Sequence, residues 1–228
     1  MSSDAAVAHA DRKMARGALI VIEGLDRAGK STQCAILVDK LREKGHETKY
    51  IRFPDRTTSI GKIIDGYLRG ETQLDDHAIH LLFSANRWEL ASQIRQDISN
   101  GISIVIDRYS YSGAVYSAAK NNRELSLEWA WQSEIGLPRP DLWFFLNISP
   151  EKAESRGGYG LERYENVTLQ LRVGELFKSM QGMENNEEMR IIDANQSKEQ
   201  VARDISAQVL AAVDSIEGPL RQLGHMPF

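Results

Sequence analysis

The sequence predicts an α/β protein whose five-stranded parallel sheet carries helices on both faces. Two observations lead to this prediction. Short apolar segments alternate along the chain with segments of helical periodicity, the pattern of parallel strands joined by helical crossovers. The first apolar segment also runs through a glycine-rich turn directly into a helix. Because no internal repeat or Pro/Gly-rich linker interrupts it, 17–228 is expected to form a single domain, after a disordered tail over 1–16.

The expected strands are short runs rich in apolar residues, as required of strands buried between two layers of helices. They cover 18–23, 48–53, 102–107, 142–148 and 190–193. Several expected helices have a capping residue, such as Asp75 or Asp76 before the long helix and Gly101 after it. The helices cover 30–44, 60–68, 75–99, 112–119, 126–135, 150–156, 167–180 and 198–213. No pattern assigns the segment 217–228 to an element.

Composition excludes several classes of protein. With 28 Lys and Arg against 32 Asp and Glu, the 228-residue chain has a net charge of −4, which argues against a general nucleic-acid binder. A single cysteine, Cys34, excludes a disulfide within the chain and is expected in the core. No apolar run approaches the roughly 18 residues of a membrane-spanning helix. We therefore expect a cytoplasmic protein without a nucleic-acid or membrane partner, although a nuclear or mitochondrial pool is compatible with the same features.

The segment 24–31, GLDRAGKS, matches the pattern G-x-x-x-x-G-K-[ST] without a mismatch. Glycines at this spacing let backbone amides turn toward a phosphate, Lys30 reaches the β- and γ-phosphate oxygens, and Ser31 joins the shell of a Mg²⁺ ion. The N-terminus of the following helix adds partial positive charge. A buried strand before the loop and an amphipathic helix after it disfavour a chance glycine-rich turn. The sequence therefore predicts a P-loop NTPase fold.

Two charged residues inside this loop carry further information. Arg27 places a guanidinium where it would stabilise charge developing on a transferred phosphate. Asp26 is an anion in an anion-binding loop, which is unfavourable unless the carboxylate meets a hydroxyl group or a cation. A salt bridge that braces the loop remains the alternative interpretation of Asp26.

The third expected strand ends in Asp107, and Arg108 follows it. In open parallel sheets, ligands bind at the carboxyl edge of the strands. After a P-loop, an aspartate at that edge usually holds Mg²⁺, often through water. The alternative, a salt bridge between neighbouring residues, is disfavoured by the P-loop upstream.

Two pairs of an aromatic residue and an arginine point to recognition of a planar ligand. Phe83 and Arg87 lie one turn apart on one face of the long helix, an arrangement that suits a nucleobase. Phe53 and Arg56 flank Pro54 at the end of the second strand, at the same ligand edge. A place in the core is the alternative for both phenylalanines, and for Phe83 taken alone it is the favoured one.

A glycine-rich segment over 156–165, RGGYGLERYE, joins two expected helices. Its three glycines permit large backbone motion, and its arginines and tyrosines could cover phosphate groups and exclude water. This composition predicts a short flexible lid, with a solvated turn as the alternative.

Taken together, these motifs resemble the thymidylate kinase family in its eukaryotic form, a member of the nucleoside monophosphate kinase superfamily. The resemblance covers about 16–223, nearly the whole ordered chain. A DRYxxSG stretch combined with a DRAG sequence inside the P-loop is specific to the family, whereas the P-loop alone is not. The matching segments are RGALIVIEGLDRAGKSTQ at 16–33, RFPDR at 52–56, HLLFSANRWE at 80–89, DRYSYSG at 107–113, GLPRPDL at 136–142 and ERYEN at 162–166.

The resemblance implies an enzyme that transfers the γ-phosphoryl group of ATP to dTMP, giving dTDP for dTTP biosynthesis, with Mg²⁺ as cofactor. It also implies a homodimer formed through helices that face away from the P-loop, the long helix included. The implied catalytic residues are Arg27, Lys30, Asp107 and Arg108, and the implied metal ligands are Ser31 and Asp107, with water as a possible intermediary. The implied ATP contacts are Gly24, Asp26, Arg27, Ala28, Gly29, Lys30, Ser31, Thr32, Arg156 and Asn195. The implied dTMP contacts are Asp26, Phe53, Arg56, Phe83, Arg87, Arg108, Ser112, Gly113, Tyr116, Tyr164 and Gln170.

Individual roles also follow from the resemblance. The family's pattern assigns Asp26 to the sugar 3′-hydroxyl, Phe83 to stacking on thymine and Arg87 to hydrogen bonding with the base. Arg108, together with the arginine at 56, is assigned to the dTMP phosphate. Tyr116 is assigned to the sugar 2′ position, where it selects deoxyribose. Many eukaryotic relatives carry Phe at this position, so the hydroxyl of Tyr116 is a departure from their pattern.

Two other classes of P-loop protein are alternatives to this function. A deoxynucleoside kinase needs a carboxylate base near the second strand, and the only candidate there, Asp55, has Arg56 beside it, which suits a phosphate better. A P-loop nucleotide switch would read guanine through an Asn-Lys-x-Asp sequence, and the chain has none. Phosphoryl transfer to dTMP therefore remains the favoured function.

Overall fold

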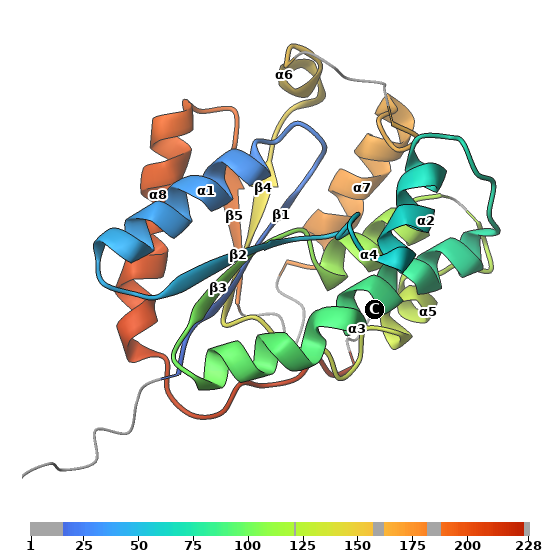
Figure 1. Cartoon of the computed structure of the whole chain (residues 1–228). Coiled ribbons are helices and arrows are strands. Elements are labelled where there is room, and N and C mark those ends of the chain that lie inside the picture. The colour runs from blue at the N-terminus through green and yellow to red at the C-terminus, as the bar shows by residue number, and fades with distance from the viewer. Residues whose placement is uncertain (1–15, 121, 157–161, 182–187, 226–228) are drawn as a thin grey trace, which may run out of the picture.

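The computed structural model describes residues 16–120, 122–156, 162–181 and 188–225. Within this part of the chain, parallel strands form one sheet in the order β2-β3-β1-β4-β5 (Figure 1). The prediction of an α/β fold with a five-stranded parallel sheet is confirmed. The strands are β1 (Leu19–Gly24), β2 (Thr48–Arg52), β3 (Ser103–Asp107), β4 (Leu142–Asn147) and β5 (Met189–Asp193).

Helices cover both faces of the sheet, as predicted. Figure 1 shows α1 and α8 side by side on one face, with α3, α4 and α7 on the other. Among the described residues, no helix is both long and apolar enough to cross a membrane. The helices are α1 (Lys30–Glu43), α2 (Ser59–Leu68), α3 (Asp76–Ser99), α4 (Ser110–Ala118), α5 (Leu127–Gln132), α6 (Pro150–Glu154), α7 (Val167–Ser179) and α8 (Lys198–Ala212), and a 3₁₀ turn follows at Val213–Ser215.

Two helix boundaries differ from the sequence prediction for identifiable reasons. Helix α5 ends at Gln132, earlier than predicted, because the chain turns at Ser133 and then passes through Gly136 with φ +93°. Helix α4 begins at Ser110 rather than at Ser112. Backbone amides at its N-terminus donate hydrogen bonds to the carboxylate of Glu23 on β1, a partner distant in sequence, so no local capping residue marks the start.

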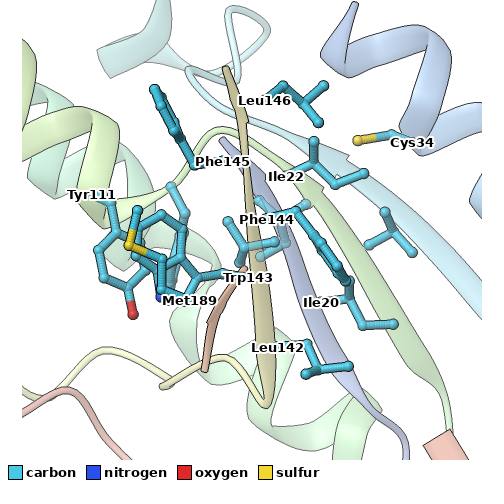
Figure 2. Packing of buried hydrophobic residues seen from close by; sticks show 14 of the residues in the cluster. Ile20, Ile22, Cys34, Tyr111, Leu142, Trp143, Phe144, Phe145, Leu146 and Met189 are labelled. Atoms are coloured by element: carbon cyan, nitrogen blue, oxygen red, sulfur yellow. The ribbon is translucent and has the colours of Figure 1, made fainter. Parts of the chain in front are cut away.

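The core is centred on β1 and β4, whose side chains are buried on both faces of the sheet (Figure 2). Trp143 stacks on Tyr111 with ring centroids 4.1 Å apart, and Phe145 stacks on Phe177 at 4.5 Å. Cys34 is fully buried in the same core, as expected, and this burial raises the pKa of its thiol. The large central side chains hold the two middle strands rigidly beneath the carboxyl edge of the sheet.

The segment 217–228, which the sequence did not assign, forms through residue 225 a strap along the loop before β4. Leu223 exchanges backbone hydrogen bonds with Gly136 and Leu137, each at 2.8 Å, and its side chain is buried. Trp131 donates from its indole nitrogen to the carbonyl oxygen of Gly224 at 2.8 Å. Arg16, the last residue of the predicted tail, pairs with Asp141 beside this strap, while 1–15 lie outside the described residues.

We expect Leu223→Ala to lower the free energy of unfolding by about 2–5 kcal/mol, because it removes a buried side chain that joins the strap to the core. Urea denaturation of the two proteins measures the loss. Leu171→Ala is the matched control, since Leu171 is half exposed on α7, and its effect should stay within about 0.5 kcal/mol. Equal effects of the two substitutions would mean that the strap contributes nothing to stability.

Candidate active site

The loop between β1 and α1 is the first part of the site. It starts at Gly24 with φ +149°, where a Cβ atom would lie 2.8 Å from the carbonyl oxygen of Leu146, and it ends at Gly29 with φ +96°. Lys30 then begins α1, and its Nζ donates to the carbonyl oxygen of Leu25 at 2.7 Å. Burial, with a smaller contribution from the nearby Arg108, lowers the pKa of Lys30 to about 8. The lysine therefore stays mostly protonated at neutral pH.

A hydroxyl group and a carboxylate that could both bind a metal ion lie together beside this loop. Ser31 donates from Oγ to Oδ2 of Asp107 at 2.5 Å, and the Tyr50 hydroxyl donates to the same oxygen at 3.2 Å. Among the described residues, no three His, Cys, Asp or Glu side chains converge to hold a metal ion. A hydroxyl and one carboxylate fit Mg²⁺, which binds oxygen ligands and takes most of its shell from water and substrate phosphates. The predicted pair Ser31 and Asp107 is thus brought together in a form that suits this ion.

Arg108 lies at the centre of a polar network on the other side of the loop. It follows β3 with φ +65°, and its guanidinium forms a short ion pair with Asp26 and donates to the Tyr116 hydroxyl at 3.3 Å. Gln170 on α7 donates to the second carboxylate oxygen of Asp26 at 2.6 Å. The acid that looked misplaced in an anion-binding loop therefore has a cation and an amide as partners, and Oδ1 and Oδ2 are both engaged.

Two more arginines of the site pair with carboxylates near the predicted lid. Arg27, in the left-handed region at φ +63°, pairs with Glu165 at 2.9 Å. Arg56 pairs with Glu162 at 2.8 Å and with Asp65 at 2.7 Å. The middle of the predicted lid, 157–161, lies outside the described residues. The C-terminal end of the predicted lid thus brings negative charge to the arginines expected to bind phosphates.

The aromatic end of the site is built mainly on α3 and α4. Arg87 is buried and forms a bidentate pair with Glu134, at 2.7 and 2.5 Å. A Cβ atom at Gly113 would lie 2.3 Å from Nη2 of Arg87, so only glycine leaves room for this guanidinium. Phe83 lies one helical turn from Arg87 and 6.5 Å from the ring of Tyr164. The arrangement leaves an aromatic ring and a fixed cation side by side.

A single cavity of about 800 Å³ takes in both ends of this arrangement. Most of the residues predicted from the sequence line it: Asp26, Arg27, Ala28, Gly29, Lys30, Ser31, Thr32, Phe53, Arg56, Phe83, Arg87, Asp107, Arg108, Ser112, Gly113, Tyr116, Arg156 and Tyr164. Gly24 and Gln170 are not part of this lining, but each is hydrogen-bonded to a residue that is. The carbonyl oxygen of Gly24 accepts from Arg108, and Gln170 donates to Asp26. The volume is in the range of cavities that enclose small-molecule ligands.

Arg156 and Asn195 are both expected at the ATP end, but only Arg156 lines the cavity. Arg156 donates to the carbonyl oxygen of Arg27 at 2.7 Å and to that of Ala194 at 3.1 Å, so it spans the P-loop and the loop after β5. Asn195 is not among the residues that line the cavity; its side chain bonds to the amide of Ser149 and to Asp193. It ties together the loops that follow β4 and β5.

The sequence pattern does not indicate several acidic residues of the site. Glu134, Glu162 and Glu165 pair with arginines far away in the sequence, and nothing in their local pattern indicated this. Glu23 did give a signal, because it is an acid at the end of an otherwise apolar buried strand. A charged residue at such a position requires a partner in the fold.

Comparisons with known proteins agree with this geometry. The family model described as thymidylate kinase matches residues 22–205. The thymidylate kinase of Schizosaccharomyces pombe is 48% identical over 90% of this chain and 95% of its own length, and the human one is 44% identical over 91% and 97%. The solved structure of a thymidylate kinase from Candida albicans superposes with a TM-score of 0.84, at 38% identity, covering 92% of this chain and 99% of that one. The chain belongs to the thymidylate kinase family.

Proposed function

We propose that the cavity at the sheet edge is where this chain carries out the reaction of its family, the transfer of the γ-phosphoryl group of ATP to dTMP to give dTDP. The observation that supports this assignment is that one cavity includes both the P-loop and the pair formed by Phe83 and Arg87. A phosphate-binding end and a base-binding end in one enclosure suit two nucleotides placed phosphate to phosphate.

At the ATP end, backbone amides of the P-loop and Nζ of Lys30 would bind the β- and γ-phosphates. Arg156 lies across the P-loop and provides a flat guanidinium for the adenine ring. Ala194 and Gln196 line the cavity next to Arg156, in place of the expected Asn195.

At the dTMP end, Phe83 would stack on thymine and Arg87 would hydrogen-bond to the base. Arg87 is held rigid by Glu134, so it can present a fixed donor without a further loss of side-chain entropy. Arg56 and Arg108 would bind the 5′-phosphate, and Asp26 would accept a hydrogen bond from the sugar 3′-hydroxyl, with one of its present partners moving aside.

Other residues at this end shape the sugar and base pocket. They include Phe53, Ser112, Gly113, Tyr116 and Tyr164, all of which line the cavity, and Gln170 behind them. The ring of Tyr116 lies 5.8 Å from that of Tyr164, and in this proposal it would limit the space beside the sugar.

Ser31 and Asp107 would hold Mg²⁺, directly or through water, and the ion would supply positive charge to the phosphate oxygens. The acceptor is already a phosphate oxyanion, so the reaction needs no general base. What the chain must supply is alignment of the two phosphates and neutralisation of the charge that spreads over the transferred group. Lys30, Arg27 and Arg108 all line the cavity and would do both.

We also propose a homodimer formed through the face of α3 that points away from the P-loop. Leu81 and Trp88 lie two turns apart on this helix, and 49% and 40% of their surfaces are exposed. Trp129 of α5 packs on His77 near the start of α3 and is also partly exposed. Large apolar side chains gathered on one face are typical of an interface between subunits.

The reaction is tested by a coupled assay of ADP release with dTMP, dUMP, UMP and thymidine as acceptors, in the presence of ATP and magnesium. The proposal expects turnover to be highest with dTMP. A preference for thymidine over dTMP would identify a nucleoside kinase instead, and no turnover with dTMP would refute the proposal.

Arg27→Ala should lower kcat by about 10²-fold or more, because it removes a cation from the transferred phosphate. The KM for dTMP should change little, since Arg27 is not placed at the acceptor's base or sugar. Steady-state kinetics measures both constants. Arg203→Ala, which removes an exposed arginine of α8, should leave both unchanged. A normal kcat for Arg27→Ala would exclude the catalytic role.

Phe83→Ala should weaken dTMP binding about 10-fold while sparing ATP, because stacking of an aromatic ring on a base contributes about 1–3 kcal/mol. Isothermal titration calorimetry with each nucleotide measures the two affinities. Leu82→Ala is the control, because Leu82 packs on the same small apolar cluster and does not line the cavity. If both nucleotides lose affinity equally, Phe83 does not stack on the base.

Leu81→Glu should convert the dimer into a monomer, because it places a charge in the proposed apolar interface. Light scattering coupled to gel filtration measures the mass. Leu171→Glu alters a leucine that is equally exposed on α7, outside the interface, and should leave the dimer intact. A monomeric unmodified protein, or a dimer that survives Leu81→Glu, would contradict the proposed interface.

A further inference from the structure

Glu23 is a fully buried acid for which the reaction described above has no use. It lies at the end of β1, directly before Gly24 of the P-loop, and none of its surface is exposed. Burial raises the pKa of this carboxyl, and hydrogen bonds from Ser112 oppose the shift. A buried acid in the central strand is unfavourable unless its partners compensate for the lost hydration.

The partners of Glu23 all lie on the chain just after Arg108. Oε1 accepts hydrogen bonds from the backbone amides of Tyr109 at 2.9 Å and Ser112 at 3.0 Å. Oε2 accepts a short hydrogen bond from the hydroxyl of Ser112. These amides belong to the N-terminus of α4, which has no capping side chain of its own, and the positive end of the helix favours a negative charge there. One carboxylate thus caps a helix that is distant in sequence.

The residues of β1 on either side of Glu23 bind Arg108 directly. The amide of Arg108 donates to the carbonyl oxygen of Ile22 at 3.1 Å, and its guanidinium donates to the carbonyl oxygen of Gly24 at 3.1 Å. Between these two contacts, Glu23 binds the amide of Tyr109, the next residue. The backbone of Arg108 is in the left-handed region at φ +65°, which is unfavourable for a residue with a side chain and requires support from its surroundings.

We infer that Glu23 is a positioning residue for Arg108: its carboxylate fixes the turn between β3 and α4 against the P-loop strand, and so aims the Arg108 guanidinium at the acceptor phosphate. The inference rests on the proposed role of Arg108 at that phosphate. Glu23 itself is fully buried and is not among the residues that line the cavity, so it would not touch either nucleotide. Its effect on catalysis passes through the placement of one guanidinium.

The test compares Glu23→Gln with the unmodified enzyme under steady-state conditions, well below the melting temperature of either protein. Glutamine keeps the size of the side chain and loses the charge and one acceptor oxygen, so the turn loses part of its anchor. We expect kcat/KM for dTMP to fall about 10- to 100-fold, because a small displacement of a catalytic cation has effects of this size. The KM for ATP should stay within about twofold, since the P-loop amides and Lys30 are untouched.

Two further variants separate positioning from stability. Glu188→Gln is the matched control: Glu188 is a buried acid that pairs with Arg139 and Arg221 away from the cavity. Glu188→Gln should lower Tm without changing the ratio of the KM for dTMP to the KM for ATP. Glu23→Asp keeps the charge but shortens the side chain, so we expect the same loss selective for dTMP even if Glu23→Gln does not fold.

Arg108→Ala, assayed in parallel, separates the positioning role of Glu23 from the proposed role of Arg108 at the acceptor phosphate. If Arg108→Ala leaves kcat/KM for dTMP unchanged, the proposed role of Arg108 is wrong and the inference falls with it. If Arg108→Ala is impaired while Glu23→Gln or Glu23→Asp matches the unmodified enzyme, only the inference is overturned. It is likewise overturned if the Glu23 variants lose affinity for dTMP and ATP equally, as a general structural defect would produce.

Discussion

Repulsion between the cations gathered at one edge of the sheet is the constraint on which the rest of this structure depends. A cavity for two polyanionic nucleotides needs several positive groups close together, and each must be stable before any nucleotide arrives. Four arginines at the site are therefore paired with carboxylates in the folded protein. The pairs are Arg27 with Glu165, Arg56 with Glu162, Arg87 with Glu134, and Arg108 with Asp26.

Two of these pairs mark the extremes of burial at the site. Arg87 and Glu134 are both almost wholly buried, so breaking them apart would leave an unpaired charge in the core, and the pair is a permanent part of the fold. Arg56 and Glu162 are each about one-third exposed, at 35% and 36%, so solvent screens their attraction and a phosphate can compete for the arginine. The site thus combines a rigid end, where we propose that the base binds, with an exchangeable end proposed for phosphates.

The central strand β1 connects these features because it lies between β3 and β4 in the sheet. Strand β3 ends in Asp107 and leads into Arg108, and the end of β4 lies against Gly24. The last residues of β1 therefore contact the P-loop, the turn before α4 and the core at once. The aromatic packing beneath it in Figure 2 makes this edge rigid, which is what alignment of two phosphates requires.

By itself, the sequence determined the P-loop, the class of fold, nearly every element and the residues at strand ends, because all of these depend on local spacing and periodicity. Asp107 could be predicted as a site residue since parallel strands bring their carboxyl ends to one edge. Only the tertiary structure decided that Glu134 fixes Arg87, that Glu23 caps α4, that Asn195 binds the amide of Ser149, and that the C-terminal strap packs beside the loop before β4. Each of these joins groups tens of residues apart or more, and the pairing of buried charges and amides across such distances depends on packing in three dimensions, which no local pattern records.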